Sequence, residues 1–399
     1  MPLSPRVLFV VAYLRGNDGI TSHMRDLAEG LMADGWTVAI ASCMNDNAAH
    51  TVRGPAWFES RGIRHFSVPF PDGRRPDNHP RDMLHAWPAF QSVLREFDPD
   101  VLHLHALSLA PYAWLQRAMG GVPYVTTCHI QPHANRFKIR LGAAVNRFVP
   151  TFLGNRSIAV GSELWDSLHD ELNVPAGQID TIPYGIDASR FRPPTDEERA
   201  SARAAFDLTP DTFTVSVIGR LNPVKRQDVL IEAVVHLRKQ GIPATALVAG
   251  SGDWEPYLRE KIDELQAGDY VQMLGFTDAQ QVVWASDATA LPSSWESFGI
   301  VVPEAMLCEV VPVRTPAAGA TDQIDDGETG FIVPFDDPAS MAERLRFLAE
   351  YPERRAEMGR SAREAVLSRF TAEIMTGNII RCYESALAVR ATPAVAVSA

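Results

Sequence analysis

Two cations five residues apart follow an apolar run in the second half of the sequence. Arg220 comes directly after the run TFTVSVIG (212–219), and Lys225 comes just before a helical pattern. A loop from a strand to a helix suits a phosphodiester or pyrophosphate, because amides at the helix start point at the anion. Arginine adds a planar fork of donors and lysine adds a compact charge. These two side chains could neutralise a leaving diphosphate; alternatively, they are solvated surface cations.

A second group of candidate ligand-binding residues lies in the stretch ESFGIVVPEA, residues 296–305. Gly299 allows the backbone close to a ligand, and Phe298-Gly299-Ile300 is predicted to open a helix whose free amides can bind a sugar or phosphate. Glu304 then falls inside the helix, where its two carboxylate oxygens can accept both hydroxyls of a ribose. The alternative is that Glu296 and Glu304 are two solvated acids on one helix.

Histidines end two of the apolar runs in the first half. His129 closes PYVTTCH (123–129), and at the end of a strand it could contact a donor sugar or an acceptor hydroxyl. The alternative is a structural histidine. His103 and His105 share one face of the run 101–106; the first is predicted to be buried packing and the second to line a ligand cleft.

The strands and helices that position these residues are predicted from short apolar runs that alternate with segments of helical apolar spacing. In the first half, residues 7–14 form a buried strand rather than a signal segment, and a helix is predicted over Ser22–Ala33. Further strands are predicted at 36–42, 101–106, 123–129 and 157–162. Strands that alternate with helices indicate βαβ units and a parallel sheet covered on both faces.

The same alternation restarts after a proline-rich, charged segment, 183–198, which is interpreted as an interdomain linker. Strands are predicted at 212–219, 245–250, 270–274, 288–292 and 310–315, with a helix over 227–240. The fold class is therefore α/β, with two doubly wound Rossmann-like domains. They are predicted to span 1–186 and 187–375 and to face across a ligand cleft. Residues 376–399 are predicted as a helix that packs back on the first domain, plus a frayed tail.

Composition excludes several classes of protein. The 399 residues carry 37 basic and 49 acidic side chains, a net charge of −12, which argues against general nucleic-acid binding. Four scattered cysteines without a C-x-x-C pair predict neither a disulfide framework nor a zinc site, and they suit a cytoplasmic protein. The stretch 136–147 holds four basic residues and no acid. It could dock on an anionic membrane, but a solvated surface is favoured.

The two motifs together resemble a known family. G-R-x-x-x-x-K followed by E-x-F-G-x-x-x-x-E is similar to the pairing in retaining glycosyltransferases of family 4, which have the GT-B fold. Four supporting stretches share the resemblance, which runs over about residues 6–385: GNDGITSHMRDLAEGLMADG, PDVLHLH, VAGSGDW and DDGETGFIVP.

The resemblance implies roles for the site residues. Arg220 and Lys225 would hold the donor diphosphate, Glu304 the ribose, and Glu296 would face the donor sugar. The implied catalytic set is His129, Arg220, Lys225 and Glu296. The implied donor site adds Gly19, Gly250, Ser297, Phe298, Gly299, Ile300 and Glu304. The implied acceptor contacts are Asp18, His105 and His129.

Four sites depart from the family pattern, and one of them is Ile130, which follows His129 where the family usually has Asp. In the glycine-rich turn, Asp18-Gly19 stands where the family has a Gly-Gly pair, and Glu309 stands where glycine is frequent. Ala318-Gly319-Ala320 replaces a Gly-Gly pair that an acid follows. The last two departures are predicted to tune packing or the choice of base, whereas Asp18 bears on how the loop meets diphosphate and acceptor.

The activity that the resemblance implies is transfer of a hexose-type sugar from a nucleoside diphosphate sugar to a hydroxyl, with retention of configuration. UDP is the expected nucleotide, and neither a metal nor a cofactor is expected. Alternatives are a sugar-nucleotide epimerase, a glycoside phosphorylase or a catalytically silent sugar-nucleotide-binding relative. The acceptor and the oligomeric state are not predicted.

Overall fold

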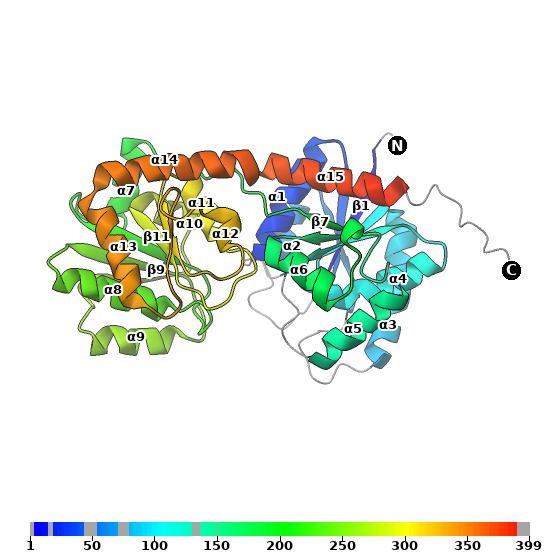
Figure 1. Ribbon diagram of the computed structural model, residues 1–399. Coiled ribbons are helices and arrows are strands. Elements are labelled where there is room, and N and C mark those ends of the chain that lie inside the picture. The colour runs from blue at the N-terminus through cyan, green and yellow to red at the C-terminus, as the bar shows by residue number, and fades with distance from the viewer. Residues whose placement is uncertain are drawn as a thin grey trace. The chain divides into compact units, whose positions relative to one another are not determined.

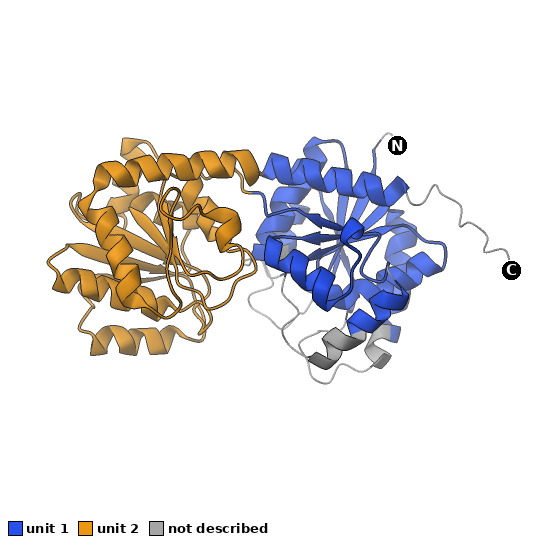
Figure 2. Cartoon of the chain, viewed as in Figure 1, with its two compact units in different colours: residues 1–185, 372–399 blue, residues 186–371 orange. Residues whose placement is uncertain are grey.

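The computed structural model describes residues 4–14, 19–43, 54–70, 80–129, 136–149 and 151–388. The chain divides into two compact units (Figure 2). Unit 1 comprises Met1–Gly185 together with Ala372–Ala399, and unit 2 comprises Ile186–Thr371. The return of the C-terminal segment to unit 1 means that the chain crosses between the units twice.

Unit 1 is built on a seven-stranded parallel sheet in the order β3-β2-β1-β4-β5-β6-β7. Its strands are β1 (Arg6–Val11), β2 (Thr37–Ser42), β3 (Arg64–Ser67), β4 (Val101–Leu104), β5 (Tyr124–Cys128), β6 (Arg156–Ala159) and β7 (Ile179–Thr181). The central strands are buried along almost their whole length, as expected for a parallel sheet with helices on both faces (Figure 1).

The helices of unit 1 include one from the far end of the chain. They are α1 (Gly19–Ala33), α2 (Gly54–Glu59), α3 (Pro80–Phe97), α4 (Ala110–Ala118), α5 (Arg136–Phe148), α6 (Ser162–Asp166) and α15 (Ala372–Ala388). Helix α15 packs against α1 and adds Met375, Ile379 and Tyr383 to the core of unit 1. Burial of this apolar face fixes the C-terminal helix on the sheet.

Unit 2 repeats the architecture with a six-stranded parallel sheet in the order β10-β9-β8-β11-β12-β13. Its strands are β8 (Phe213–Ile218), β9 (Ala244–Ala249), β10 (Val271–Gly275), β11 (Ala288–Leu291), β12 (Val311–Arg314) and β13 (Phe331–Ile332). Its helices are α7 (Asp196–Ala204), α8 (Gln227–Lys239), α9 (Glu255–Glu264), α10 (Ala279–Ala285), α11 (Val301–Leu307), α12 (Ala320–Gln323), α13 (Pro338–Glu350) and α14 (Pro352–Arg369).

Each sheet reverses its strand order once. The reversal lies between β1 and β4 in unit 1 and between β8 and β11 in unit 2. The loops that leave these two strands diverge to opposite faces of the sheet, which opens a crevice at their carboxyl ends. In unit 2 the predicted donor-binding residues follow β8 and β11, and in unit 1 two of the predicted histidines follow β4 and β5.

The predicted fold class is confirmed. Strands β3, β7 and β13 were not predicted, and each is short and lies at or near an edge of its sheet. Edge strands are only partly covered, so their sequences lack the continuous apolar runs that mark the central strands.

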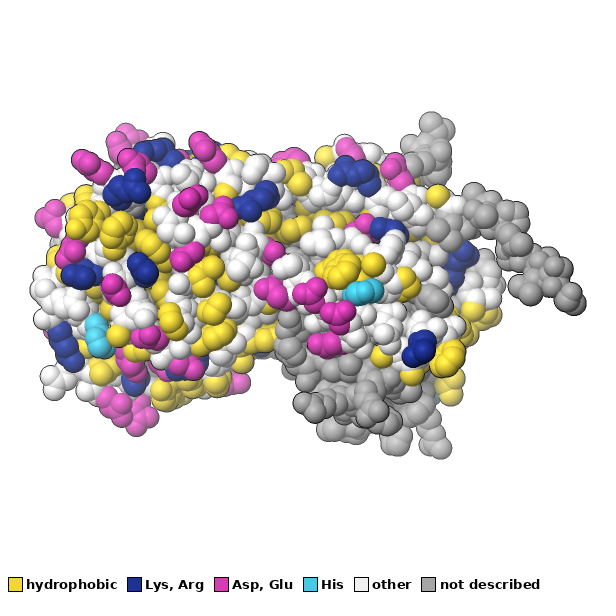
Figure 3. Space-filling view, viewed as in Figure 1, with side chains coloured by type: hydrophobic (Ala, Val, Ile, Leu, Met, Phe, Trp, Pro, Cys, Tyr) yellow, Lys and Arg dark blue, Asp and Glu magenta, His cyan; other side chains and the backbone are white. Residues whose placement is uncertain are grey.

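The surface of unit 2 carries charges of both signs. On the face seen in Figure 3, acidic and basic side chains are interspersed over this unit. No helix within the described ranges combines the length and the apolar composition that crossing a bilayer requires.

Candidate functional site

Three loops meet at the carboxyl ends of β8, β9 and β11 in unit 2. The amide of Ser294, after β11, donates to the carbonyl of Val224, after β8, at 2.8 Å. The amide of Leu221 donates to the carbonyl of Ser251, after β9, at 3.0 Å. These backbone bonds hold the loops that carry Arg220, Lys225 and Glu296 side by side.

Lys225 and Glu296 form an ion pair at this junction. Lys225 Nζ donates to Glu296 Oε1 at 2.5 Å, and Ser293 Oγ donates to the same oxygen at 2.7 Å. The side chain of Glu296 is 8% exposed, whereas that of Lys225 is 26% exposed. A carboxylate that is nearly buried needs such partners, because burial without them is costly. The two motifs found in the sequence are thus joined through their charged side chains.

Arg220 lies beside this pair with its side chain exposed to solvent. Its carbonyl accepts a hydrogen bond from Gln227 Nε2 at 2.9 Å, which ties the turn to the first residue of α8. A Cβ on the preceding Gly219 would lie 4.0 Å from Cε of Lys225, so the lysine stem runs over this glycine. The arginine and the lysine therefore leave the same short turn.

Gly250 directly follows β9, at the point where its loop crosses the loop after β8. Its φ is +138°, and a Cβ there would lie 1.9 Å from the carbonyl oxygen of Gly219. Only glycine allows the two backbones to approach this closely. The residue therefore shapes the turn that carries Arg220.

Replacement of Gly250 by alanine is expected to displace the Gly219–Arg220 turn, because the added Cβ would collide with the carbonyl oxygen of Gly219. The melting temperature should fall, and the affinity for a diphosphate ligand should fall at least tenfold. Gly268→Ala is the matched control, because nothing lies within 4 Å of a Cβ at that position. Thermal unfolding and ligand titration of both variants measure the effect. Equal behaviour of the two variants would show that the contact does not shape the site.

Helix α11 begins beside Glu296. Gly299 has a φ of +81°, and the carboxylate of Glu304 sits half-buried on the fourth residue of the helix. Ile300 caps the helix start without a side-chain hydrogen bond, and Ser297 is half-buried. The backbone from Ser297 to Ile300 thus leads directly into the turn that carries Glu304.

A buried arginine that the sequence analysis did not single out holds this turn. Arg314, at the end of β12, is 0% exposed. Its guanidinium donates to the carbonyl of Phe298 at 3.2 Å and to Gln323 Oε1 at 2.5 Å. It also donates to the carbonyls of Ala317 and Ala318, at 2.9 and 3.0 Å. The guanidinium of Arg314 therefore links the turn before α11 to the loop before α12.

The predicted histidines of unit 1 lie in a separate cluster. His105 Nδ1 lies 3.0 Å from His129 Nε2, and His129 Nδ1 lies 2.6 Å from the hydroxyl of Tyr184. His103 is fully buried and bonds the hydroxyls of Tyr383 and Thr127, both at 2.6 Å. Both ring nitrogens of His129 therefore already have partners within unit 1.

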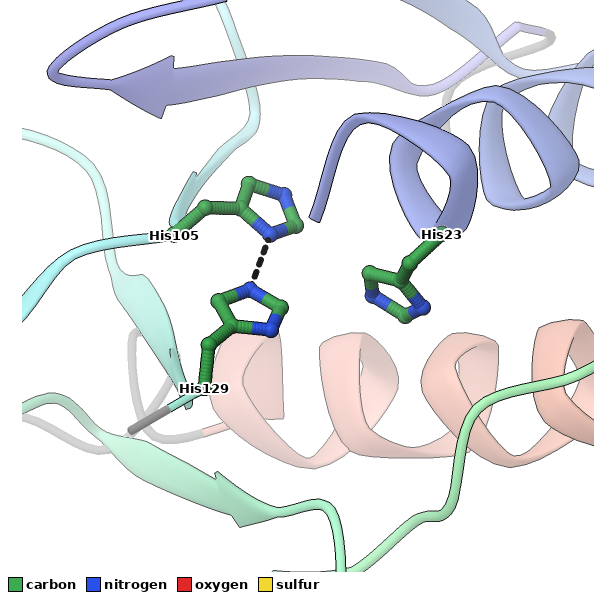
Figure 4. A group of neighbouring side chains, drawn as sticks. All are labelled: His23, His105 and His129. Atoms are coloured by element: carbon green, nitrogen blue, oxygen red, sulfur yellow. Dashed lines mark hydrogen bonds between the residues drawn. The ribbon is translucent and has the colours of Figure 1, made fainter. Parts of the chain in front are cut away.

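A third histidine, His23 on α1, faces His105 and His129 (Figure 4). Burial lowers the pKa of His23 to about 3. Burial, and then the neighbouring histidines, hold the pKa values of His105 and His129 well below their usual 6.5. All three rings are therefore neutral at physiological pH, able to donate from one nitrogen and accept at the other.

The structure thus separates the predicted residues into two groups. Unit 2 holds Arg220, Lys225, Gly250 and the stretch from Glu296 to Glu304. Unit 1 holds His105, His129 and Gly19, the first residue of α1, whereas Asp18 lies outside the described residues. Ser293, Gln323, Arg314 and His23 were missed. Arg314 could have been found from the sequence, because it lies in the apolar run VVPVRT, which is predicted to be a buried strand. Arginine is almost never fully buried unless it is paired, so a buried arginine predicts polar partners around it.

Two family models match the chain, one in each half. "Glycosyltransferase Family 4" matches residues 17–190, and "Glycosyl transferases group 1" matches residues 198–365. Together they span both units.

Curated relatives agree with these matches. A D-inositol 3-phosphate glycosyltransferase from Saccharomonospora viridis is 31% identical over 72% of this chain and 70% of its own length. A protein of the same name from Segniliparus rotundus is 27% identical over 92% of this chain and 85% of its own length.

Solved structures share the fold. The crystal structure of HepE from Anabaena, in complex with UDP and glucose, superposes with a TM-score of 0.79 at 20% identity, covering 96% of this chain and 100% of that one. A glycosyltransferase from Rickettsia africae superposes with a TM-score of 0.82 at 18% identity, covering 96% of this chain and 99% of that one. At these identities the likeness shows that both units have the Rossmann-like architecture of GT-B enzymes.

Proposed function

Because the chain belongs to the family-4 glycosyltransferases, we propose that it transfers a hexose-type sugar from UDP-sugar to a hydroxyl group, with retention of anomeric configuration. Unit 2 binds the donor and unit 1 supplies the acceptor contacts. The observation that carries the proposal is the Lys225–Glu296 ion pair beside the exposed Arg220, on loops that leave the two strands at the reversal point of the sheet.

The two cations act on the leaving group. As the bond between the sugar and the diphosphate breaks, negative charge builds on the departing oxygen. Arg220 and Lys225 oppose that charge, and fixed donors aimed at developing charge are among the largest contributors to catalysis. Glu304, one helical turn into α11, accepts the ribose hydroxyls.

Glu296 faces the donor sugar without serving as a nucleophile. Its Oε1 accepts hydrogen bonds from both Lys225 and Ser293, which makes the carboxylate the partner that holds the lysine in place. In the proposed step the acceptor hydroxyl attacks from the face that the diphosphate leaves, and the leaving phosphate oxygen takes the acceptor proton. His129, neutral and held by Tyr184, belongs to the acceptor side together with His105. No metal ion is required for this step.

The relatives' name supports a choice of the acceptor class to test first. Because several relatives are named for D-inositol 3-phosphate, an inositol phosphate is the first acceptor to test for this chain.

Two measurements test the function. UDP-, GDP- and ADP-sugars are screened for thermal stabilisation of the chain, since ligand binding raises the melting temperature by mass action. The stabilising donor is then mixed with candidate acceptors, and free nucleotide and product configuration are followed by chromatography and NMR.

We expect stabilisation by a UDP-sugar and nucleotide release that depends on the acceptor. Release without an acceptor, or conversion of the donor into an isomer, would contradict transfer and favour hydrolysis or epimerisation. An inverted product would contradict the proposed stereochemistry alone.

A further inference from the structure

Three histidines converge from three elements at the point where the sheet of unit 1 reverses its strand order. His23 lies on α1, His105 follows β4 and His129 follows β5. One ring nitrogen from each lies within 4.8 Å of the other two, and all three side chains are buried (Figure 4). The sequence predicted no such group, because 82 and 24 residues separate neighbouring members.

Both ring nitrogens of His23 lack hydrogen-bond partners among the described residues, so an ion on either nitrogen would satisfy a buried group that no described residue satisfies. His23 is 1% exposed and His105 is 2% exposed. A buried polar group left without a partner costs about 1–3 kcal/mol, so native structures rarely leave several together.

We propose that His23, His105 and His129 form a binding site for a transition-metal ion, with Zn²⁺ the best fit. Neutral imidazole is the histidine form that binds zinc, and three histidines with an open fourth position make a frequent zinc site. The facing nitrogens His105 Nδ1 and His129 Nε2 are 3.0 Å apart, close to the roughly 3.3 Å edge of a tetrahedron with bonds of about 2.0 Å.

The surroundings also suit a metal ion. An ion would replace the hydrogen bond between His105 Nδ1 and His129 Nε2, so that both nitrogens would present lone pairs to it. The ring proton of His129 would then sit on Nδ1, which lies 2.6 Å from the hydroxyl of Tyr184 and could donate to it. Metal-binding histidines generally donate their other N–H in this way, which orients the ring. An ion at this point would connect the start of α1 with the ends of β4 and β5.

The test uses untagged full-length protein, stripped of metal with a chelator and then titrated with Zn²⁺. Metal content is measured by mass spectrometry, affinity by calorimetry and stability by thermal unfolding. The variants are His23→Gln and His105→Gln. His103→Gln is the matched control, because His103 is a buried histidine of the same cluster whose two nitrogens bond Tyr383 and Thr127.

We expect the wild type and H103Q to bind about one Zn²⁺ per chain and to melt at a higher temperature when it is present. H23Q and H105Q should bind it at least tenfold more weakly. Circular dichroism confirms that each variant is folded; if H105Q is not, H23Q decides. Wild-type protein that binds no Zn²⁺, or H23Q that binds it as tightly as the wild type, would overturn the proposal. Neither readout needs a sugar nucleotide, so zinc binding can be scored whether or not the chain transfers a sugar, although His105 and His129 also carry the acceptor role proposed above.

Discussion

Replacing Lys225 by glutamine is expected to lower kcat by about 10²–10³-fold, the loss seen when one donor to a developing negative charge is removed. The amide keeps a donor near Glu296 but loses the positive charge that faces the leaving diphosphate. Arg220→Ala is expected to have an effect of the same order, because its exposed guanidinium leaves the same turn. Steady-state kinetics with the stabilising donor measure both variants.

Lys239→Gln is the matched control for Lys225, since it removes an exposed lysine from the far end of α8. Its kcat should equal that of the wild type. Circular dichroism and thermal unfolding establish that each variant is folded. Near wild-type rates in both K225Q and R220A would refute the role given to these two cations.

Arg314→Met is expected to lower the free energy of unfolding of unit 2 by at least about 3 kcal/mol, because it orphans several buried acceptors at once. The carbonyls of Phe298, Ala317 and Ala318 would lose the guanidinium that bridges them. Methionine fills much of the volume, so the loss reports on the hydrogen bonds more than on a cavity. Urea denaturation measures the change.

The same variant should also weaken donor binding, because the turn before α11 would lose its support. Arg360→Met on α14 is the control, since that arginine is exposed. Equal stability and donor affinity in R314M and R360M would show that the buried fork does not position the turn.

Much of the fold was predictable because the central strands of a parallel sheet are buried on both faces. The strand predicted at 212–219 is β8 (Phe213–Ile218), and the helix predicted over 227–240 is α8 (Gln227–Lys239). The edge strands were not predicted, since β3 has only one buried residue in four. Glu309 is a position where the structure explains a departure from the family pattern. Its φ is +61°, a backbone conformation that glycine adopts readily, so glycine is frequent there in the family.

The site was predictable only where its residues are neighbours along the chain. The two motifs placed Arg220, Lys225 and Glu296 on loops at one edge of a sheet, but the ion pair itself needed the structure. The roles of Arg314 and His23 depend on partners distant in sequence, such as Phe298 for the arginine and His105 for the histidine. Patterns in neighbouring residues of the sequence do not indicate contacts of this kind.

A crystal structure of the chain with bound UDP tests the central claim most directly. We expect phosphate oxygens within hydrogen-bond distance of Arg220 and Lys225, and the ribose hydroxyls on the carboxylate of Glu304. UDP bound away from these three side chains would contradict it.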